Sequence, residues 1–146
     1  MKTVLVFGVF DLFHFGHLRL LKRAAEFGDY FIVAVQSDEY ILKYKPPGAL
    51  GTLYSTSERM EMVRSLRCVD KVITYDNVAD DIQAISFDIW IKGPDNTHSG
   101  IQTAVEWCKK NNKEVITLPR TEGISSTYLK RLLANINYNE SENKND

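Results

Sequence analysis

The sequence has few cysteines, no excess of charge of either sign and no long apolar run. Cys68 and Cys108 are its two cysteines among 146 residues. Without metal-type spacing they are expected to be unreactive packing residues, with a disulfide between them as the alternative. The net charge of −1 argues against a nucleic-acid partner, because such proteins are usually basic.

No apolar run approaches the length of a membrane-spanning helix, and the N-terminus leads directly into a predicted strand without a signal-peptide layout. No membrane partner and a cytoplasmic location are therefore expected. The apolar fraction of 44% and the charged fraction of 25% are typical of a globular protein. We expect residues 1–134 to form one domain and the polar stretch 135–146 to form a disordered tail.

Apolar runs and helical patterns alternate along the chain. The predicted strands are residues 4–7, 30–35, 69–74, 88–92 and 114–118, and the predicted helices are roughly 17–27, 38–44, 55–66, 78–86, 101–110 and 127–133. This alternation predicts the α/β class, with a Rossmann-like, doubly wound, five-stranded parallel sheet and helices on both faces. Ligands of such folds bind outside the carboxyl ends of the strands, where the strand order reverses.

Residues 4–17 are the most informative stretch at such a strand end. An apolar run stops at Gly8, a short loop follows, and a helix begins near His14 and His17. A strand that leads into a helix N-terminus favours anions, because free backbone N–H groups and the helix dipole both point there. Two imidazoles at this place predict a site that holds and neutralises the phosphates of a nucleotide.

Two motifs in the chain resemble those of a known superfamily. His14-Phe15-Gly16-His17 matches the His-x-Gly-His signature of nucleotidyltransferases, within a Gly-x-Phe-Asp-x-x-His-x-Gly-His frame that begins at Gly8. The sequence Arg-Thr-Glu-Gly-Ile-Ser-Ser-Thr from Arg120 resembles the second motif in the form found in cytidylyltransferases. Over residues 4–133 the chain therefore resembles the cytidylyltransferase family.

The resemblance implies direct, in-line transfer of CMP from CTP to a small phosphorylated acceptor, such as glycerol-3-phosphate, a related polyol phosphate or a phosphonate, with release of pyrophosphate. It also implies a magnesium ion bound to the triphosphate, although the sequence contains no evident carboxylate cage for it. Members commonly form dimers, so a homodimer is expected.

The resemblance assigns roles to individual residues. The implied catalytic residues are His14, His17, Arg120 and Lys43. The implied nucleotide-binding residues are Gly8, Val9, Phe10, Gly16, Asp95, Arg120, Thr121, Ile124, Ser125 and Ser126. Lys45, Arg59 and Arg67 are implied to bind the acceptor.

Several of these residues have structural alternatives. Arg59 could pair with a glutamate on a solvated helix face, and Arg67 could cap the C-terminus of the same helix. Lys43 and Lys45 could be ordinary exposed lysines. Asp11 is expected to organise its tight loop and not to contact substrate.

The chain also departs from the family pattern near the acceptor. Where the family typically has Gly-Asp-Asp-Trp, this chain has Gly93-Pro94-Asp95-Asn96, and the loop at residues 46–53 is longer. These differences leave the acceptor open. An adenylyltransferase of the same fold, using ATP with a sugar phosphate or a coenzyme precursor, is the alternative function. A non-catalytic nucleotide-binding module is a third possibility.

Overall fold

The computed structural model describes residues 1–44, 51–94, 99–121 and 123–143. Five parallel strands form one sheet in the order β3-β2-β1-β4-β5. The strands are β1 (Thr3–Gly8), β2 (Tyr30–Gln36), β3 (Lys71–Tyr75), β4 (Ile89–Lys92) and β5 (Glu114–Thr117). This confirms the predicted α/β fold and places the reversal of strand order between β1 and β4.

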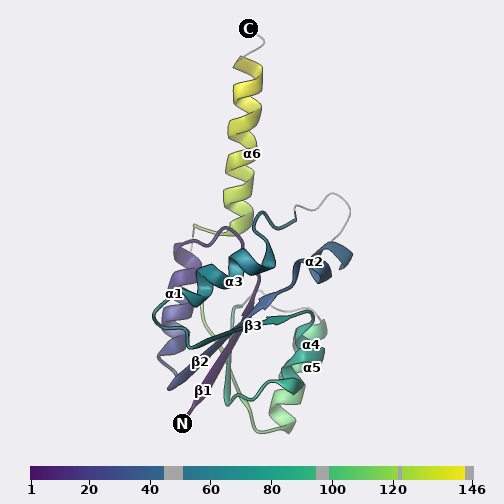
Figure 1. Cartoon of the computed structure of the whole chain (residues 1–146). Coiled ribbons are helices and arrows are strands. Elements are labelled where there is room, and N and C mark those ends of the chain that lie inside the picture. Colours follow the sequence, from purple (N-terminus) through teal and green to yellow (C-terminus); the bar gives the residue numbers. More distant parts are fainter. Residues whose placement is uncertain (45–50, 95–98, 122, 144–146) are drawn as a thin grey trace.

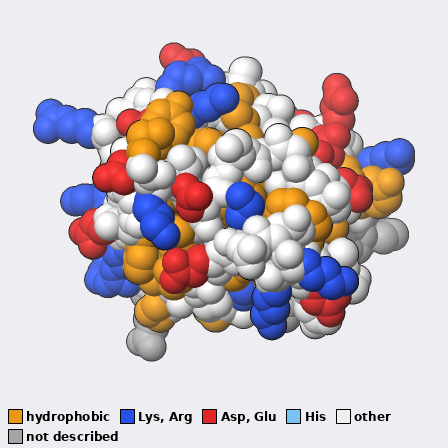
Figure 2. Space-filling view, turned by 90° about the horizontal axis from the view of Figure 1, so that it is seen from below, with side chains coloured by type: hydrophobic (Ala, Val, Ile, Leu, Met, Phe, Trp, Pro, Cys, Tyr) orange, Lys and Arg blue, Asp and Glu red, His pale blue; other side chains and the backbone are white. Residues whose placement is uncertain are grey.

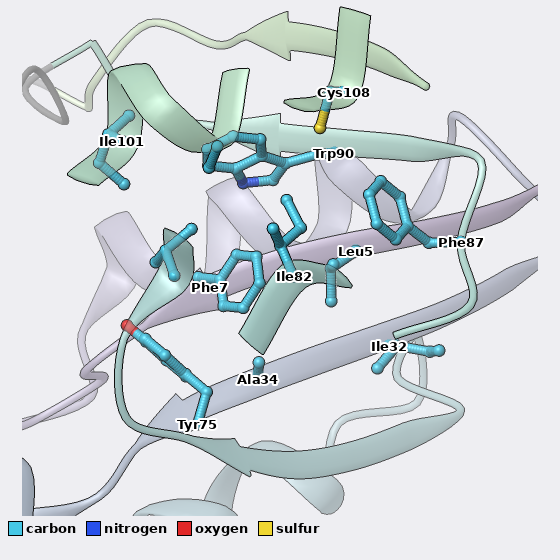
Figure 3. Close-up of a cluster of buried hydrophobic side chains, with 12 residues drawn as sticks. Leu5, Phe7, Ile32, Ala34, Tyr75, Ile82, Phe87, Trp90, Ile101 and Cys108 are labelled. Carbon is cyan, nitrogen blue, oxygen red and sulfur yellow. The ribbon is translucent and has the colours of Figure 1, made fainter. Parts of the chain in front are cut away.

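The central strands are apolar on both sides because each side of the sheet carries its own core. Leu5 and Phe7 face one cluster of buried side chains, whereas Val4 and Val6 face the other, as the alternation of side chains along a strand requires. In the first cluster the ring of Phe7 packs edge-on against Tyr75, with centroids 4.8 Å apart (Figure 3). The buried Trp90 belongs to the same cluster.

Helices cover both faces of the sheet (Figure 1). The structure contains α1 (Phe15–Ala25), α2 (Asp38–Tyr44), α3 (Thr56–Arg64), α4 (Val78–Asp81) with the 3₁₀ turn η1 (Ile82–Ala84), α5 (Ser99–Lys110) and α6 (Ser126–Asn143). Leu21 of α1 and Val63 of α3 lie in one core cluster, whereas Ile82 and Ala104 lie in the other. The two pairs of helices therefore enclose the sheet.

Local sequence signals account for where several helices begin. Ser55 caps α3, accepting from the Glu58 N–H, while the Glu58 carboxylate accepts from the Ser55 N–H. This reciprocal capping box is the one that the sequence predicts. Ser37 caps α2 in a similar way, since its hydroxyl accepts from the N–H of Tyr40.

The last helix is longer than the sequence predicts. α6 continues to Asn143, well beyond Leu133, and leaves the body of the molecule as a single straight rod (Figure 1). The helical span predicted from the sequence, which ends at Leu133, is therefore too short, and the expectation of a disordered tail stays a prediction. The separation of a 1–134 domain from a tail stays a prediction.

The surface carries mixed charge. On the face opposite α6, Lys and Arg side chains are interspersed with Asp and Glu side chains (Figure 2). Across the described ranges, no helix combines the length and apolar character needed to cross a bilayer. Cys68 and Cys108 are both free thiols, and Cys108 is buried, as the sequence predicts for packing residues.

Candidate active site

A cavity of about 330 Å³ lies at the carboxyl ends of β1, β4 and β5. It brings together the two motifs from opposite ends of the chain, as the sequence predicts. The lining residues include His14 and His17, and also Gly8, Val9, Phe10, Gly16, Arg120, Thr121, Ile124, Ser125 and Ser126. The cavity sits where the strand order reverses, which is the usual ligand position in a doubly wound sheet.

The two histidines form a capping box at the start of α1. The Nδ1 atom of His14 accepts from the N–H groups of Gly16 (3.0 Å) and His17 (3.4 Å). In return, the Nδ1 atom of His17 accepts from the N–H of His14 at 3.3 Å. The imidazoles thus replace the hydroxyl and carboxylate of an ordinary capping box. The N–H groups of His14, Gly16 and His17 are therefore used within the protein. The imidazole N–H groups are left as the donors that a ligand can meet.

This arrangement fixes the tautomer of both rings. A nitrogen that accepts a hydrogen bond carries no proton, so each neutral ring holds its proton on Nε2. The Nε2 atom of His14 is buried and has no hydrogen-bond partner among the residues that the structure describes. A buried donor without a partner is costly, and an acceptor such as a phosphate oxygen would satisfy it.

Both histidines are held neutral. Burial lowers the pKa of His17 to about 3, helped by the charge of His14. Burial and the nearby Arg120 guanidinium lower the pKa of His14. The two rings stack with centroids 3.8 Å apart, an arrangement that two cations would oppose. The site therefore offers neutral N–H donors together with the positive charge of Arg120.

The loop before α1 has an unusual backbone. Phe10 and Leu12 have φ angles of 57° and 46°, a region that bulky residues rarely adopt. This conformation lays the Phe10 ring over Gly8, where a β-carbon would come within 2.6 Å of the ring. The same ring packs edge-on against His17, with centroids 5.4 Å apart. Gly8 is thus required by the Phe10 ring, which in turn supports His17.

Gly16 is required for a related reason. A β-carbon on Gly16 would lie 2.8 Å from Cε1 of His14 and 3.3 Å from a methyl group of Ile124. The family resemblance implies that Gly16 makes room for the nucleotide. In the structure, the groups that crowd this position are His14 and Ile124.

The second motif forms the opposite wall and leads into α6. Ser125 caps this helix, since its hydroxyl accepts from the N–H of Tyr128 at 3.0 Å. The hydroxyl of Ser126 donates to the carbonyl oxygen of Asp11 in the loop before α1. Gly123 has a φ angle of 80°, which explains a glycine at that turn. The N-terminal end of a second helix therefore also faces the cavity.

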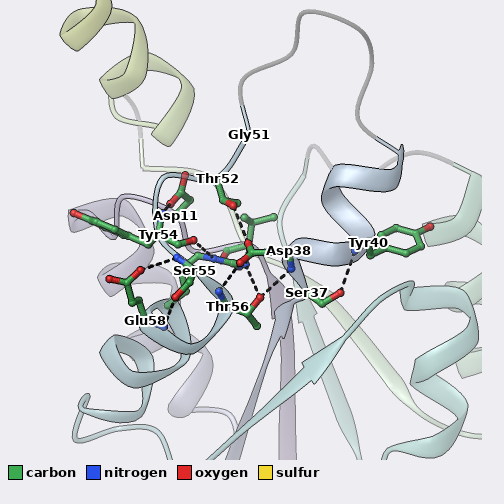
Figure 4. Close-up of polar contacts among 12 residues, drawn as sticks. Asp11, Ser37, Asp38, Tyr40, Gly51, Thr52, Tyr54, Ser55, Thr56 and Glu58 are labelled. Atoms are coloured by element: carbon green, nitrogen blue, oxygen red, sulfur yellow. Dashed lines mark hydrogen bonds and ion pairs between the residues drawn. The ribbon is translucent and has the colours of Figure 1, made fainter.

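Arg59 is not on a solvated face and does not line the cavity. Its side chain has no exposed surface, and it donates to the carbonyl oxygens of Val9 (2.7 Å) and Tyr54 (3.1 Å) and to the carboxylate of Asp38 (2.7 Å). Figure 4 shows the polar cluster around Asp38. The alternative of a glutamate pair on a solvated helix face is therefore wrong, since Arg59 is buried and pairs with Asp38, whereas its role toward the acceptor stays a prediction.

Lys43 and Arg67 do not line the cavity. Lys43 is exposed in the last turn of α2, with its ammonium 5.4 Å from the ring centroid of Tyr44. Arg67 is exposed after the end of α3. Lys45 and Asp95 fall outside the described residues.

Arg23 is a lining residue that lies outside both motifs. It lies in the last turn of α1, at the far end of a face that also carries His17 and Leu20. The three-residue spacing from His17 to Leu20 to Arg23 is the signal that marks this face. The cavity therefore has a second arginine along its wall.

No protein-built metal centre is found in the part of the chain that the structure describes, where no three His, Cys, Asp or Glu side chains gather. The described lining residues include no carboxylate. Among the described lining residues a divalent cation therefore meets no carboxylate ligand, and Mg²⁺ commonly keeps water and takes oxygen ligands from substrate phosphates.

Comparison with known proteins gives a consistent result. A family model described as cytidylyltransferase-like matches residues 5–132. A glycerol-3-phosphate cytidylyltransferase of Staphylococcus aureus is 38% identical over 137 residues, which cover 91% of this chain and 96% of that protein. A protein of the same name from Bacillus subtilis is 34% identical, and the match covers 93% of this chain and 100% of that protein.

A solved structure shares the fold. The lipopolysaccharide core biosynthesis protein from Thermoplasma volcanium superimposes with a TM-score of 0.69 over 84% of this chain and 99% of that chain. Its sequence is 21% identical. This likeness supports the fold described above.

Proposed function

The chain belongs to the cytidylyltransferase-like family, and on that premise we propose that it transfers CMP from CTP to glycerol-3-phosphate and releases pyrophosphate. The observation that carries the proposal is the meeting of the paired histidines and the Arg120 motif at one cavity. Relatives that bear the glycerol-3-phosphate cytidylyltransferase name match this chain over nearly its whole length and theirs, which supports this acceptor.

In the proposed reaction, a phosphate oxygen of the acceptor attacks the α-phosphorus of CTP. The new P–O bond forms as the bond to the bridging α–β oxygen breaks, and the electron pair leaves with pyrophosphate. The protein needs no covalent nucleophile for this transfer; it has to position the two reactants and stabilise charge.

Different described groups would bind the phosphates and stabilise the charge. The Nε2–H groups of His14 and His17 would donate to phosphate oxygens, because the hydrogen bonds accepted by Nδ1 keep the proton of each neutral ring on Nε2. The guanidinium of Arg120 would offset charge on the pyrophosphate as it leaves. The N-terminus of α6 adds a favourable dipole at the same wall.

Magnesium, a dimeric state and a cytoplasmic location are part of the proposal. Mg²⁺ would enter with the triphosphate and offset charge that two arginines cannot fully neutralise. Asp95 beside the cytidine and Lys45 at the acceptor stay predictions, as do roles for Lys43 and Arg67.

The proposal is tested by pyrophosphate release with CTP and each of several phosphorylated polyols, with and without Mg²⁺. We expect turnover with glycerol-3-phosphate and loss of turnover when EDTA removes the ion. Parallel thermal-shift measurements with CTP and ATP test the nucleotide. Stabilisation and turnover with ATP alone would favour the adenylyltransferase alternative, and CTP binding without turnover of any acceptor would favour a binding module.

A further inference from the structure

The loop between β1 and α1 (residues 9–14) is held from outside the cavity. Its Phe10 and Leu12 have positive φ angles, a conformation that is strained for bulky residues and persists only when surrounding contacts impose it. Asp11 lies between them and is 2% exposed. The contacts of Asp11 therefore decide whether the strained loop keeps its shape.

Asp11 is the centre of a small buried network. Its carboxylate accepts from the N–H groups of Leu53 (2.8 Å) and Tyr54 (3.0 Å), and Figure 4 shows it beside the segment that carries Thr52 and Tyr54. The third donor comes from α6, where the ammonium of Lys130 lies 2.7 Å from the same carboxylate. Together these donors hold the pKa of Asp11 below its ordinary value, although burial alone would raise it.

Lys130 is itself enclosed. Its side chain is 13% exposed, and its ammonium also donates to the carbonyl oxygen of Gly51 at 3.0 Å. One ammonium on α6 thus joins the loop before α1 to the segment before α3. The hydroxyl of Ser126, one helical turn earlier on α6, donates to the backbone carbonyl of Asp11. Two neighbouring turns of α6 therefore both bind Asp11, one at its carboxylate and one at its backbone carbonyl.

Phe10 connects Asp11 to His17. Asp11 follows Phe10 directly, and the Phe10 ring fills the space between Gly8 and His17. A loop that relaxed to ordinary φ angles would withdraw this ring from His17. The route from α6 to the cavity therefore runs from Lys130 to Asp11, then to Phe10 and His17.

We propose that Lys130 is a positioning residue that holds the β1–α1 loop, through Asp11, in the conformation that supports His17 at the cavity. The proposal rests on the function proposed above. It assigns Lys130 no contact with CTP or with the acceptor. Its effect is to keep the Nε2–H donor of His17 close to the phosphate oxygens on which negative charge develops.

The test compares three single variants with the wild-type protein. Lys130→Met removes the ammonium and keeps the aliphatic stem, Lys130→Arg keeps a cation, and Arg131→Met is the matched control because Arg131 is exposed on the next position of α6. Steady-state kinetics are measured with CTP and glycerol-3-phosphate at a temperature where thermal unfolding shows every variant folded.

We expect Lys130→Met to lower kcat by roughly tenfold to a hundredfold, the loss that a misplacement of about 1 Å produces, with a much smaller change in the KM for the acceptor. Lys130→Arg recovers most of the loss, and Arg131→Met behaves like the wild type. In an Asp11→Asn background, Lys130→Met has a much smaller effect, because both substitutions break the same link.

A second readout does not depend on turnover. His17 is titrated by NMR in each variant, with His14 and Asp11 as the titratable groups that face it. The His17 pKa rises toward its ordinary value in Lys130→Met, because the ring becomes hydrated, and stays low in Arg131→Met. A wild-type protein without turnover would overturn the proposed function alone. A Lys130→Met protein with wild-type kcat and an unchanged His17 pKa, or full additivity with Asp11→Asn, would overturn the inference.

Discussion

The pH dependence of folding stability tests whether His17 is held neutral in the folded protein. Its folded pKa is about 3, against an ordinary value of 6.5. Below pH 6.5 the unfolded chain binds a proton at this residue that the folded protein does not bind. The stability that neutral His17 allows is therefore complete above pH 6.5, falls as the pH drops toward 3, and is lost below that value.

The size of the effect follows from the two pKa values. At pH 5 the free energy of unfolding should be lower than at pH 7.5 by about 2 kcal/mol from His17 alone. His14 contributes in the same direction, since its pKa is also lowered. Asp11 and Asp38 have pKa values below 3.8, so their contributions are lost mainly at lower pH, outside this window.

Urea unfolding of the wild type and of His17→Gln at several pH values between 7.5 and 5 measures this difference. The wild type should lose stability toward pH 5 by about 2 kcal/mol more than the variant does. Equal slopes for the two proteins would refute the conclusion that the folded state keeps His17 neutral. A slope that is steeper in the variant would contradict it as well.

Three further substitutions test other parts of the site. Gly16→Ala should displace the His14 ring and lower kcat by roughly tenfold to a hundredfold, while thermal unfolding changes little, because alanine favours the helix; a wild-type kcat would contradict this. Arg59→Met should destabilise the fold by about 3 kcal/mol in urea unfolding, since the carboxylate of Asp38 and the carbonyl oxygens of Val9 and Tyr54 lose a buried donor. The same change at the exposed Arg64 on the same helix should not. Arg120→Ala should lower kcat by about a hundredfold to a thousandfold, as the loss of one charge-stabilising donor does elsewhere, and a change in KM alone would indicate that Arg120 only binds substrate.

The order of the elements follows from local patterns, and the sequence predicts it well. The runs at residues 4–7 and 30–35 are apolar throughout, which only a strand buried on both faces requires. The capping box at Ser55 and the two motifs around His14 and Arg120 are equally local. The two motifs meet at one cavity because the sheet is parallel, and the carboxyl ends of parallel strands lie at the same edge of a sheet.

Other features depend on contacts between distant segments and leave no local signal. Arg59 stands among charged neighbours on a short helix, and its burial is explained by contacts that include the carbonyl oxygens of Val9 and Tyr54 and the carboxylate of Asp38. Phe10 and Leu12 are not residues that favour positive φ. Their conformation is imposed by Asp11 and Lys130. These residues are 119 positions apart in the sequence, yet the Lys130 Nζ atom lies 2.7 Å from Oδ2 of Asp11.

The hydrogen bonds that the backbone donates to the two imidazoles also prevent either ring from acting as a general base. With Nδ1 occupied and Nε2 already protonated, neither ring has a vacant lone pair with which to deprotonate an incoming group. Neither imidazole can then take a proton from the attacking phosphate, so the fully ionised dianion, which is the better nucleophile, is the form expected to react fastest. The rate should therefore follow the second ionisation of the phosphate ester in solution, so that the acid limb of the activity profile reports on the substrate and not on the enzyme.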